Sequence, residues 1–172
     1  MSIHPLFGPG ANIFKPQKFI LVPIKSAISE KKLFNSLFPN SKLVVCNANQ
    51  HDKSMAYVIS LVYFLNLSFI LSLDKIPHLK DISGTSFTIQ YLLASGILHD
   101  SPEVISSLQM SNKQFNEVLL NFTSNVNSIE NLIAKNDTDQ FIKIIKKVKK
   151  QIISNKKSYD DLYQLVNSID SF

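Results

Sequence analysis

The fold of this chain is decided by residues 54–73, which read SMAYVISLVYFLNLSFILSL. No charged side chain interrupts these 20 positions, so the segment meets the length and composition criteria for a membrane-spanning helix. Its polar residues are scattered around the helix, and charges flank both ends, which gives no orientation signal. A helix that is apolar on all sides also forms the centre of a helical core or a subunit interface, and this is the interpretation we favour.

Segments with helical spacing of apolar residues follow this helix along the rest of the chain. They are residues 86–98, a helix that begins at Ser101 and Pro102, residues 111–134, a helix capped by Asp137, and residues 158–169. Serine followed by proline at the first helical position is a favourable start signal. Because everything after residue 46 has helical spacing, we expect a mainly α fold.

The part of the chain before the long helix has a different pattern. Residues 19–23 (FILVP) and 42–46 (KLVVC) are short apolar runs that predict strands, and residues 29–38 between them predict a helix capped by Ser29. Prolines and glycines between residues 5 and 18 predict an ordered loop. We therefore expect a short β-α-β segment in residues 1–46 and a helical domain in residues 47–172.

The composition is that of a globular protein: of 172 residues, 45% are hydrophobic and 18% are charged. The single cysteine, Cys46, cannot form an internal disulfide, and the first residues lack the basic and apolar regions of a signal peptide. We therefore expect a cytoplasmic protein. All 18 basic residues are lysines. Lysine does not reproduce the two-bond grip of arginine on a carboxylate, so a bound anion would be held by lysines, backbone N–H groups or helix N-termini.

The net charge of +5 owes much to the lysines between residues 143 and 157. Such a run can bind nucleic acid, but a solvated helix face explains it more simply, and we expect no nucleic-acid partner. The four histidines, His4, His51, His78 and His99, do not have the spacing of metal ligands. We expect no metal site.

The first motif that can carry chemistry is residues 4–10, HPLFGPG. A histidine that stands before a proline and a glycine-bounded turn is an imidazole held on a rigid segment. Its ordinary pKa near 6.5 suits proton transfer or hydrogen bonding to a hydroxyl group. A terminal histidine without a role is the alternative interpretation of His4.

The second motif is residues 49–56, NQHDKSMA, at the start of the long helix. The positive end of the helix dipole disfavours a charged imidazole at His51 and favours a bound anion nearby. The alternative is that Asp52 merely complements the dipole while His51 is an exposed bystander.

Together, these two motifs and the strand, helix and strand between them resemble the prephenate and arogenate dehydrogenase family. The likeness continues through residues 81–90 (DISGTSFTIQ) and the helix start at residues 100–102, and it covers about residues 3–150. In that family a Rossmann domain binds NAD or NADP, and a helical domain supplies the dimer interface and part of the substrate pocket. The resemblance implies that His4 hydrogen-bonds the ring hydroxyl of prephenate and assists its oxidation, and that His51 lies near the substrate.

The chain departs from the family pattern in two respects. Its four glycines do not form the Gly-x-Gly-x-x-Gly fingerprint, so NAD or NADP would be bound by a Rossmann domain that is a separate partner or lies outside this sequence. Residues 1–46 would then be the remnant of the junction with that domain. The helical domain of the family also implies a homodimer. Thr88 stands where the family commonly has an arginine for a substrate carboxylate. Thr88, Lys53 and the start of the long helix are the expected replacements.

Three functions remain open from the sequence. The first is the dimerisation and substrate half of a prephenate or arogenate dehydrogenase, which the retained His4 and His51 favour. The second is a non-catalytic homodimeric interaction or ligand-sensing module, which the missing arginine and missing nucleotide fingerprint favour. The third is a small membrane-anchored helical protein, which partition into detergent would reveal.

Overall fold

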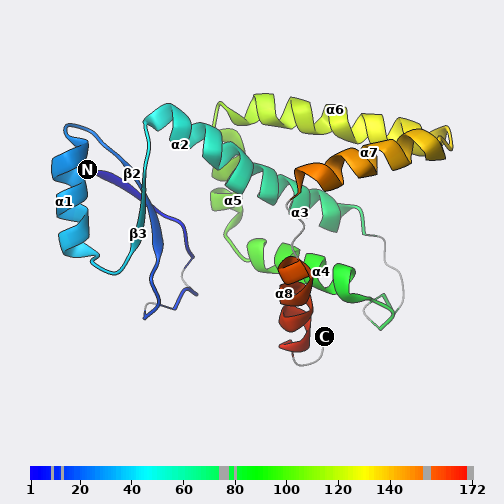
Figure 1. Cartoon of the computed structure of the whole chain (residues 1–172), viewed down its shortest axis with the longest axis horizontal. Helices are drawn as coiled ribbons and strands as arrows, with labels where there is room; N and C mark the ends of the chain where they lie inside the picture. The colour runs from blue at the N-terminus through cyan, green and yellow to red at the C-terminus, as the bar shows by residue number, and fades with distance from the viewer. Residues whose placement is uncertain (9, 13, 74–77, 80, 153–155, 170–172) are drawn as a thin grey trace. The chain divides into compact units, whose positions relative to one another are not determined.

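The structure, a computed structural model, describes residues 1–8, 10–12, 14–73, 78–79, 81–152 and 156–169. Along these residues the elements are β1 (Ser2–Pro5), β2 (Lys18–Val22), α1 (Ala27–Leu37), β3 (Lys42–Val45), α2 (Ala48–Met55), the π-helix η1 (Ala56–Leu61), α3 (Val62–Leu71), α4 (Thr85–Ile97), α5 (Pro102–Met110), α6 (Phe115–Ala134), α7 (Thr138–Gln151) and α8 (Lys156–Asn167). Figure 1 shows the strands confined to the first part of the chain. The prediction of a mainly α fold with a short N-terminal β segment is confirmed.

The chain divides into two compact units, unit 1 from Met1 to Val58 and unit 2 from Ile59 to Phe172. The sequence pattern had suggested a boundary at residues 46 and 47, where strand spacing gives way to helical spacing. The first turns of the long helix make their contacts within unit 1, α2 against β2 among them. The change in secondary structure and the division between the units therefore fall at different residues.

Unit 1 is built on a three-stranded sheet in the order β1-β2-β3. β1 is antiparallel to β2, and β2 is parallel to β3, with α1 as the connection between the two parallel strands. The central strand β2 is the most buried, and Leu21 on it is fully inaccessible. Phe34 of α1 is also fully buried, and its ring meets that of Phe19 edge-on at 5.2 Å. These apolar contacts fasten α1 to the sheet.

Two local features of unit 1 differ from the sequence prediction. β1 was not predicted, because a four-residue segment that ends at Pro5 has no strand periodicity of its own and is defined only by pairing with β2. Helix α1 begins at Ala27 with Ser26 as its N-cap, so Ser29 is a residue of the first turn rather than the cap. Ser26 Oγ accepts the hydrogen bond that Ser29 N–H donates.

The long helix begins at a capping box. Asn47 Oδ1 accepts from the N–H of Gln50 at 2.9 Å, and Gln50 Oε1 accepts from the N–H of Asn47 at 3.1 Å. The predicted single helix is a succession of α2, the π-helical turn η1 and α3, since η1 widens the backbone at residues 56–61. The whole stretch Ala48–Leu71 is long and apolar enough to cross a membrane by length and composition, a test that core helices of soluble proteins also pass.

Unit 2 is helical, and polar groups join α3 and η1 to the helices that follow. Ser60 Oγ donates to the carbonyl of Leu108 at 2.8 Å, and Gln109 Nε2 donates to the carbonyl of Ser60 at 3.0 Å. Deeper along the helix, Gln90 Nε2 of α4 donates to Oδ1 of the buried Asn66 at 2.8 Å. The two buried polar residues of the long apolar segment, Ser60 and Asn66, are thus paired with α5 and α4, as expected for a helix packed in a protein core.

The remaining helices of unit 2 contact α3 or one another. α4 and α5 contact α3, α8 contacts α4, and α6 with α7 forms an antiparallel hairpin (Figure 1). Phe64 of α3 meets the rings of Phe115 and Phe122 of α6 edge-on. Ser101 and Asp137 cap α5 and α7, as predicted, whereas α6 begins at Phe115 rather than near residue 111.

Candidate functional site

His4 is placed by the sheet of unit 1. It lies in β1, opposite Ile20 of the central strand, and its side chain is partly buried. The sequence prediction put His4 in a loop, and the structure corrects this because residues 2–5 pair with β2 along their whole length. A strand holds the direction of the side chain more firmly than a loop does, since its backbone is fixed by the ladder of hydrogen bonds.

His51 is placed by the first turn of α2. Its N–H donates to the carbonyl of Asn47, so the capping box that starts the helix also fixes the position of His51. Because β3 ends at Val45 and α2 begins at Ala48, the strand beside β2 leads directly into the helix that carries the second imidazole.

The structure brings the two imidazoles together. Nδ1 of His4 lies 2.8 Å from Nε2 of His51, and the ring centroids are 5.1 Å apart with the planes tilted by 56°. The other nitrogen of His51, Nδ1, lies 2.9 Å from Oδ1 of Asp52. A chain of three polar side chains therefore runs from Asp52 through His51 to His4.

The surroundings of His4 favour the neutral form of its imidazole. Burial lowers the pKa of His4 below its ordinary value of 6.5, and the neighbouring His51 lowers this pKa further, because a second positive charge so close would be repelled. A neutral imidazole has one nitrogen that donates and one that accepts. The arrangement can therefore accept a proton or a hydrogen bond from a hydroxyl group at near-neutral pH.

Asp52 is the third residue of this hydrogen-bonded series. From the sequence, its only expected role was to complement the helix dipole. Neighbours in sequence on a helix do not ordinarily face each other, so the pattern gave no reason to pair Asp52 with His51. The only sequence signal for this contact was that His51 and Asp52 are adjacent.

The other two predicted substrate residues are not brought to the histidine pair by anything that the structure describes. Lys53 is exposed on α2 in unit 1. Thr88 lies on α4 in unit 2, where its Oγ1 is 3.2 Å from Oγ of Ser83. Their part in substrate binding stays a prediction.

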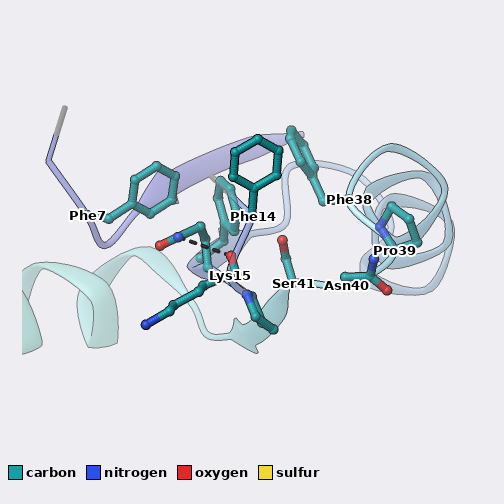
Figure 2. Close-up of a pocket in the computed structure, with 10 residues that line it drawn as sticks. Phe7, Phe14, Lys15, Phe38, Pro39, Asn40 and Ser41 are labelled. Carbon is teal, nitrogen blue, oxygen red and sulfur yellow. Dashed lines mark hydrogen bonds between the residues drawn. The ribbon is translucent and has the colours of Figure 1, made fainter. Parts of the chain in front are cut away.

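A second feature of unit 1 is an open cavity of about 520 Å³ beside the sheet. Figure 2 shows the rings of Phe7, Phe14, Phe38 and Pro39 around it. Phe7 and Phe19 meet edge-on at 5.2 Å in its wall. Neither His4 nor His51 is among its lining residues, and the sequence analysis did not predict it. Within the residues that the structure describes, no group of three metal-binding side chains occurs.

The fold and the histidine pair define a class of protein: a mainly α chain whose long apolar helix begins beside two hydrogen-bonded imidazoles. A family model described as "Prephenate dehydrogenase, dimerization domain" matches residues 47–147, which is more than half of the chain. The chain therefore belongs to the prephenate dehydrogenase family, and the resemblance inferred from the two histidine motifs is confirmed.

Individual relatives agree with this assignment. The chain is 24% identical over 162 residues to a probable arogenate/prephenate dehydrogenase of Methanocaldococcus jannaschii, and the match covers 90% of this chain and 36% of that protein. Among solved structures it is similar to Synechocystis arogenate dehydrogenase, with a TM-score of 0.66 and 16% identity over 87% of this chain and 59% of that one.

A third relative is prephenate dehydrogenase from Aquifex aeolicus, solved in complex with hydroxyphenyl propionate and NAD+. Its TM-score is also 0.66, with 20% identity over 87% of this chain and 56% of that one. These two structures share the fold with this chain. The chain spans well under two thirds of the length of each of these three relatives.

Proposed function

We propose that this chain supplies the dimer-forming half, and part of the substrate site, of a prephenate or arogenate dehydrogenase. Such an enzyme oxidises and decarboxylates prephenate or arogenate with NAD or NADP, in the synthesis of tyrosine. The observation that carries the proposal is the contact between His4 and His51, in a chain that belongs to this family. The cytoplasmic location expected from the sequence is part of the proposal.

His4 is the proposed catalytic residue. The substrate carries a hydroxyl group on the ring carbon that is oxidised, and this group must lose its proton as the carbon becomes carbonyl-like. A neutral imidazole at His4 accepts that hydrogen bond, and the lowered pKa of His4 keeps the ring neutral at physiological pH. Since the bond strengthens as the hydroxyl loses its proton, His4 contributes more to turnover than to substrate affinity.

Recognition of the substrate carboxylates stays assigned, as the sequence predicted, to Lys53, Thr88 and the backbone N–H groups at the start of the long helix. His51 is proposed to lie near the substrate as the hydrogen-bond partner of His4. The chain has no arginine, so no side chain can grip a carboxylate with two parallel bonds. A lysine acts as a point charge with less geometric specificity, and a threonine hydroxyl adds one neutral hydrogen bond. Affinity for prephenate is therefore expected to be weak.

The residues of this chain do not fit a dinucleotide. None of its four glycines belongs to a glycine-rich turn between a strand and a helix, which is what brings a backbone close to a pyrophosphate. The nicotinamide that accepts the hydride is assigned to a Rossmann domain outside this sequence, and the proposed carrier of that domain is a separate subunit.

A homodimer is proposed from the faces of α6 and α7. Both helices leave apolar side chains exposed along one stripe, and these are Val126, Ile129 and Ile133 of α6 with Ile142, Ile145 and Val148 of α7. A stripe of this kind on a helical hairpin is costly in water and marks a protein contact surface. The matching family model is described as a dimerization domain, and this supports a second copy of the chain as the partner.

The second candidate is a homodimeric module that binds a ligand without catalysis. The absence of arginine favours it, since the two-bond grip on a substrate carboxylate is missing from this chain. The two candidates differ in whether His4 affects a reaction.

The experiment is an NAD(P)-linked assay with prephenate and with arogenate, run on this chain alone and after addition of the candidate Rossmann-fold protein of the same organism. Reduction of the cofactor only when both chains are present supports the dehydrogenase. Binding of prephenate without any cofactor reduction in the mixture supports the sensing module and contradicts the enzyme.

A further inference from the structure

We infer that Asp52 is a positioning residue, which fixes the proton on Nδ1 of both imidazoles and leaves Nε2 of His4 as the bare, proton-accepting atom. This inference rests on the proposed function for its catalytic meaning. Its structural content, the order of protons along three side chains, can be tested without any substrate.

The carboxylate of Asp52 determines the position of the first proton. An ionised carboxylate only accepts hydrogen bonds, and Oδ1 of Asp52 lies 2.9 Å from Nδ1 of His51. The proton between them must therefore sit on Nδ1 of His51. A bare nitrogen at that position would direct its lone pair at a negatively charged oxygen.

The order of the remaining protons follows from the first. A neutral His51 that carries its proton on Nδ1 has a bare Nε2, and this atom lies 2.8 Å from Nδ1 of His4. Nδ1 of His4 must then be the donor, because two bare nitrogens at this distance would repel each other. A neutral His4 with its proton on Nδ1 has its lone pair on Nε2.

The consequence concerns the proposed reaction. Only an imidazole with a bare Nε2 can accept a proton through that nitrogen, so Asp52 acts on the substrate through two intervening rings. This is the same logic by which a buried aspartate selects the imidazole tautomer in a serine protease. The lowered pKa of His4 is consistent with the neutral form that the argument requires.

A matched pair elsewhere in the chain provides the control. Nδ1 of His78 also lies 2.9 Å from an aspartate oxygen, Oδ2 of Asp81, but both side chains are more than two thirds exposed. The His78–Asp81 pair lies in unit 2, whereas Asp52, His51 and His4 lie in unit 1. Asp81→Asn therefore makes the same chemical change without touching the proposed order of protons.

The test is long-range 1H–15N NMR of the histidine rings in the chain itself, at a pH of about 8, where imidazoles are neutral. We expect the protonated nitrogen of both His4 and His51 to be Nδ1. We expect Asp52→Asn to convert His4 to a mixture of tautomers and Asp81→Asn to leave His4 and His51 unchanged. A His4 protonated on Nε2 in the unaltered chain would overturn the inference, and so would an Asp52→Asn chain with an unchanged His4.

The unaltered chain decides the matter even if Asp52→Asn does not fold. In the reconstituted two-chain assay, Asp52→Asn is expected to lower kcat by roughly ten- to one hundredfold, the range for loss of an orienting partner, with little change in KM. Correct tautomers in a chain that supports no dehydrogenase activity would leave the inference standing and remove the proposed function. Dehydrogenase activity in a chain whose His4 is protonated on Nε2 would support the proposed function and overturn the inference about Asp52.

Discussion

Nδ1 of His4 and Nε2 of His51 are 2.8 Å apart, although the two residues are 47 positions apart in the sequence. One imidazole lies in β1 and the other in the first turn of α2, and both elements belong to unit 1. The sheet makes this contact possible, because β1 pairs with β2 on one side while β3, on the other side of β2, leads into α2. The histidine pair is therefore a property of unit 1 itself.

The buried pair of Asn66 and Gln90 gives a prediction about the stability of unit 2. Gln90→Leu removes the donor to Oδ1 of Asn66, which is only 2% exposed, and should lower the free energy of unfolding by about 1–3 kcal/mol. Urea denaturation would measure this as a lower midpoint with an unchanged slope. The double change Asn66→Leu with Gln90→Leu should cost less than the sum of the single changes, since no unpaired polar group is left behind.

The matched control for this pair is Asn125→Leu on α6, where the asparagine is exposed. Its effect should stay within about 0.5 kcal/mol. Additive costs of the two single changes would show that Asn66 and Gln90 do not act as a pair.

Glu30 gives a prediction about acid stability. Its buried carboxylate accepts hydrogen bonds from the backbone N–H groups of Lys25, Ile24 and Ser26, and these lower its pKa below the ordinary 4.5. The stabilisation is therefore present above pH 4.5 and is lost as the pH falls through the lower pKa of the folded state. Glu30→Gln should weaken this acid dependence of unit 1, and denaturation at a series of pH values would measure it.

Glu130→Gln, on the exposed surface of α6 in unit 2, is the matched control and should leave the acid dependence of unit 1 as it is. An unaltered acid profile in Glu30→Gln would mean that the carboxylate does not contribute to folding.

Tyr63 gives a prediction about alkaline stability. Burial and the hydrogen bond that its hydroxyl donates to Asp100 raise the pKa of Tyr63 to about 12. The corresponding stabilisation is complete below pH 10 and is lost as the pH rises through 12, because the unfolded chain ionises first. In Tyr63→Phe, the free energy of unfolding should therefore fall less between pH 10 and 12 than it does in the unaltered chain. Ultraviolet titration should show one fewer late-ionising tyrosine, and an unchanged titration would contradict the assignment.

The exposed stripe on α6 and α7 gives a prediction about assembly. Light scattering at micromolar concentration should report twice the monomer mass, with an interface well over the roughly 2,000 Å² of permanent dimers. Ile129→Lys places a charge in the stripe and should shift the chain toward monomer, whereas Ile28→Lys on the exposed face of α1 should not. A monomeric unaltered chain would rule out the proposed dimer.

The sequence predicted the helices well and the details of the site poorly. Helix starts at Ser101 and Asp137 were predictable because capping is local chemistry, encoded in a few adjacent residues. The π-helical turn at residues 56–61 was not, since its apolar residues are compatible with an ordinary α-helix.

The histidine pair shows the same division between local and tertiary information. The sequence supplied both histidines as candidates, and the family resemblance made them partners in one site. Their direct contact depends on β1, a strand that exists only through pairing with β2, and on the order β1-β2-β3. The role of Asp52 depends in turn on that contact, so no local pattern could assign it.

The central claim is that His4 accepts the hydrogen bond of the substrate hydroxyl, and the kinetics of His4→Asn test it most directly. In the NAD(P)-linked assay with prephenate and the Rossmann-fold partner, we predict that His4→Asn lowers kcat by about two to four orders of magnitude while KM changes little. His51→Ala removes the ring through which Asp52 acts on His4, so it should lower kcat at least as much as Asp52→Asn does. An unchanged kcat in His4→Asn, at full assembly with the partner, would contradict the claim.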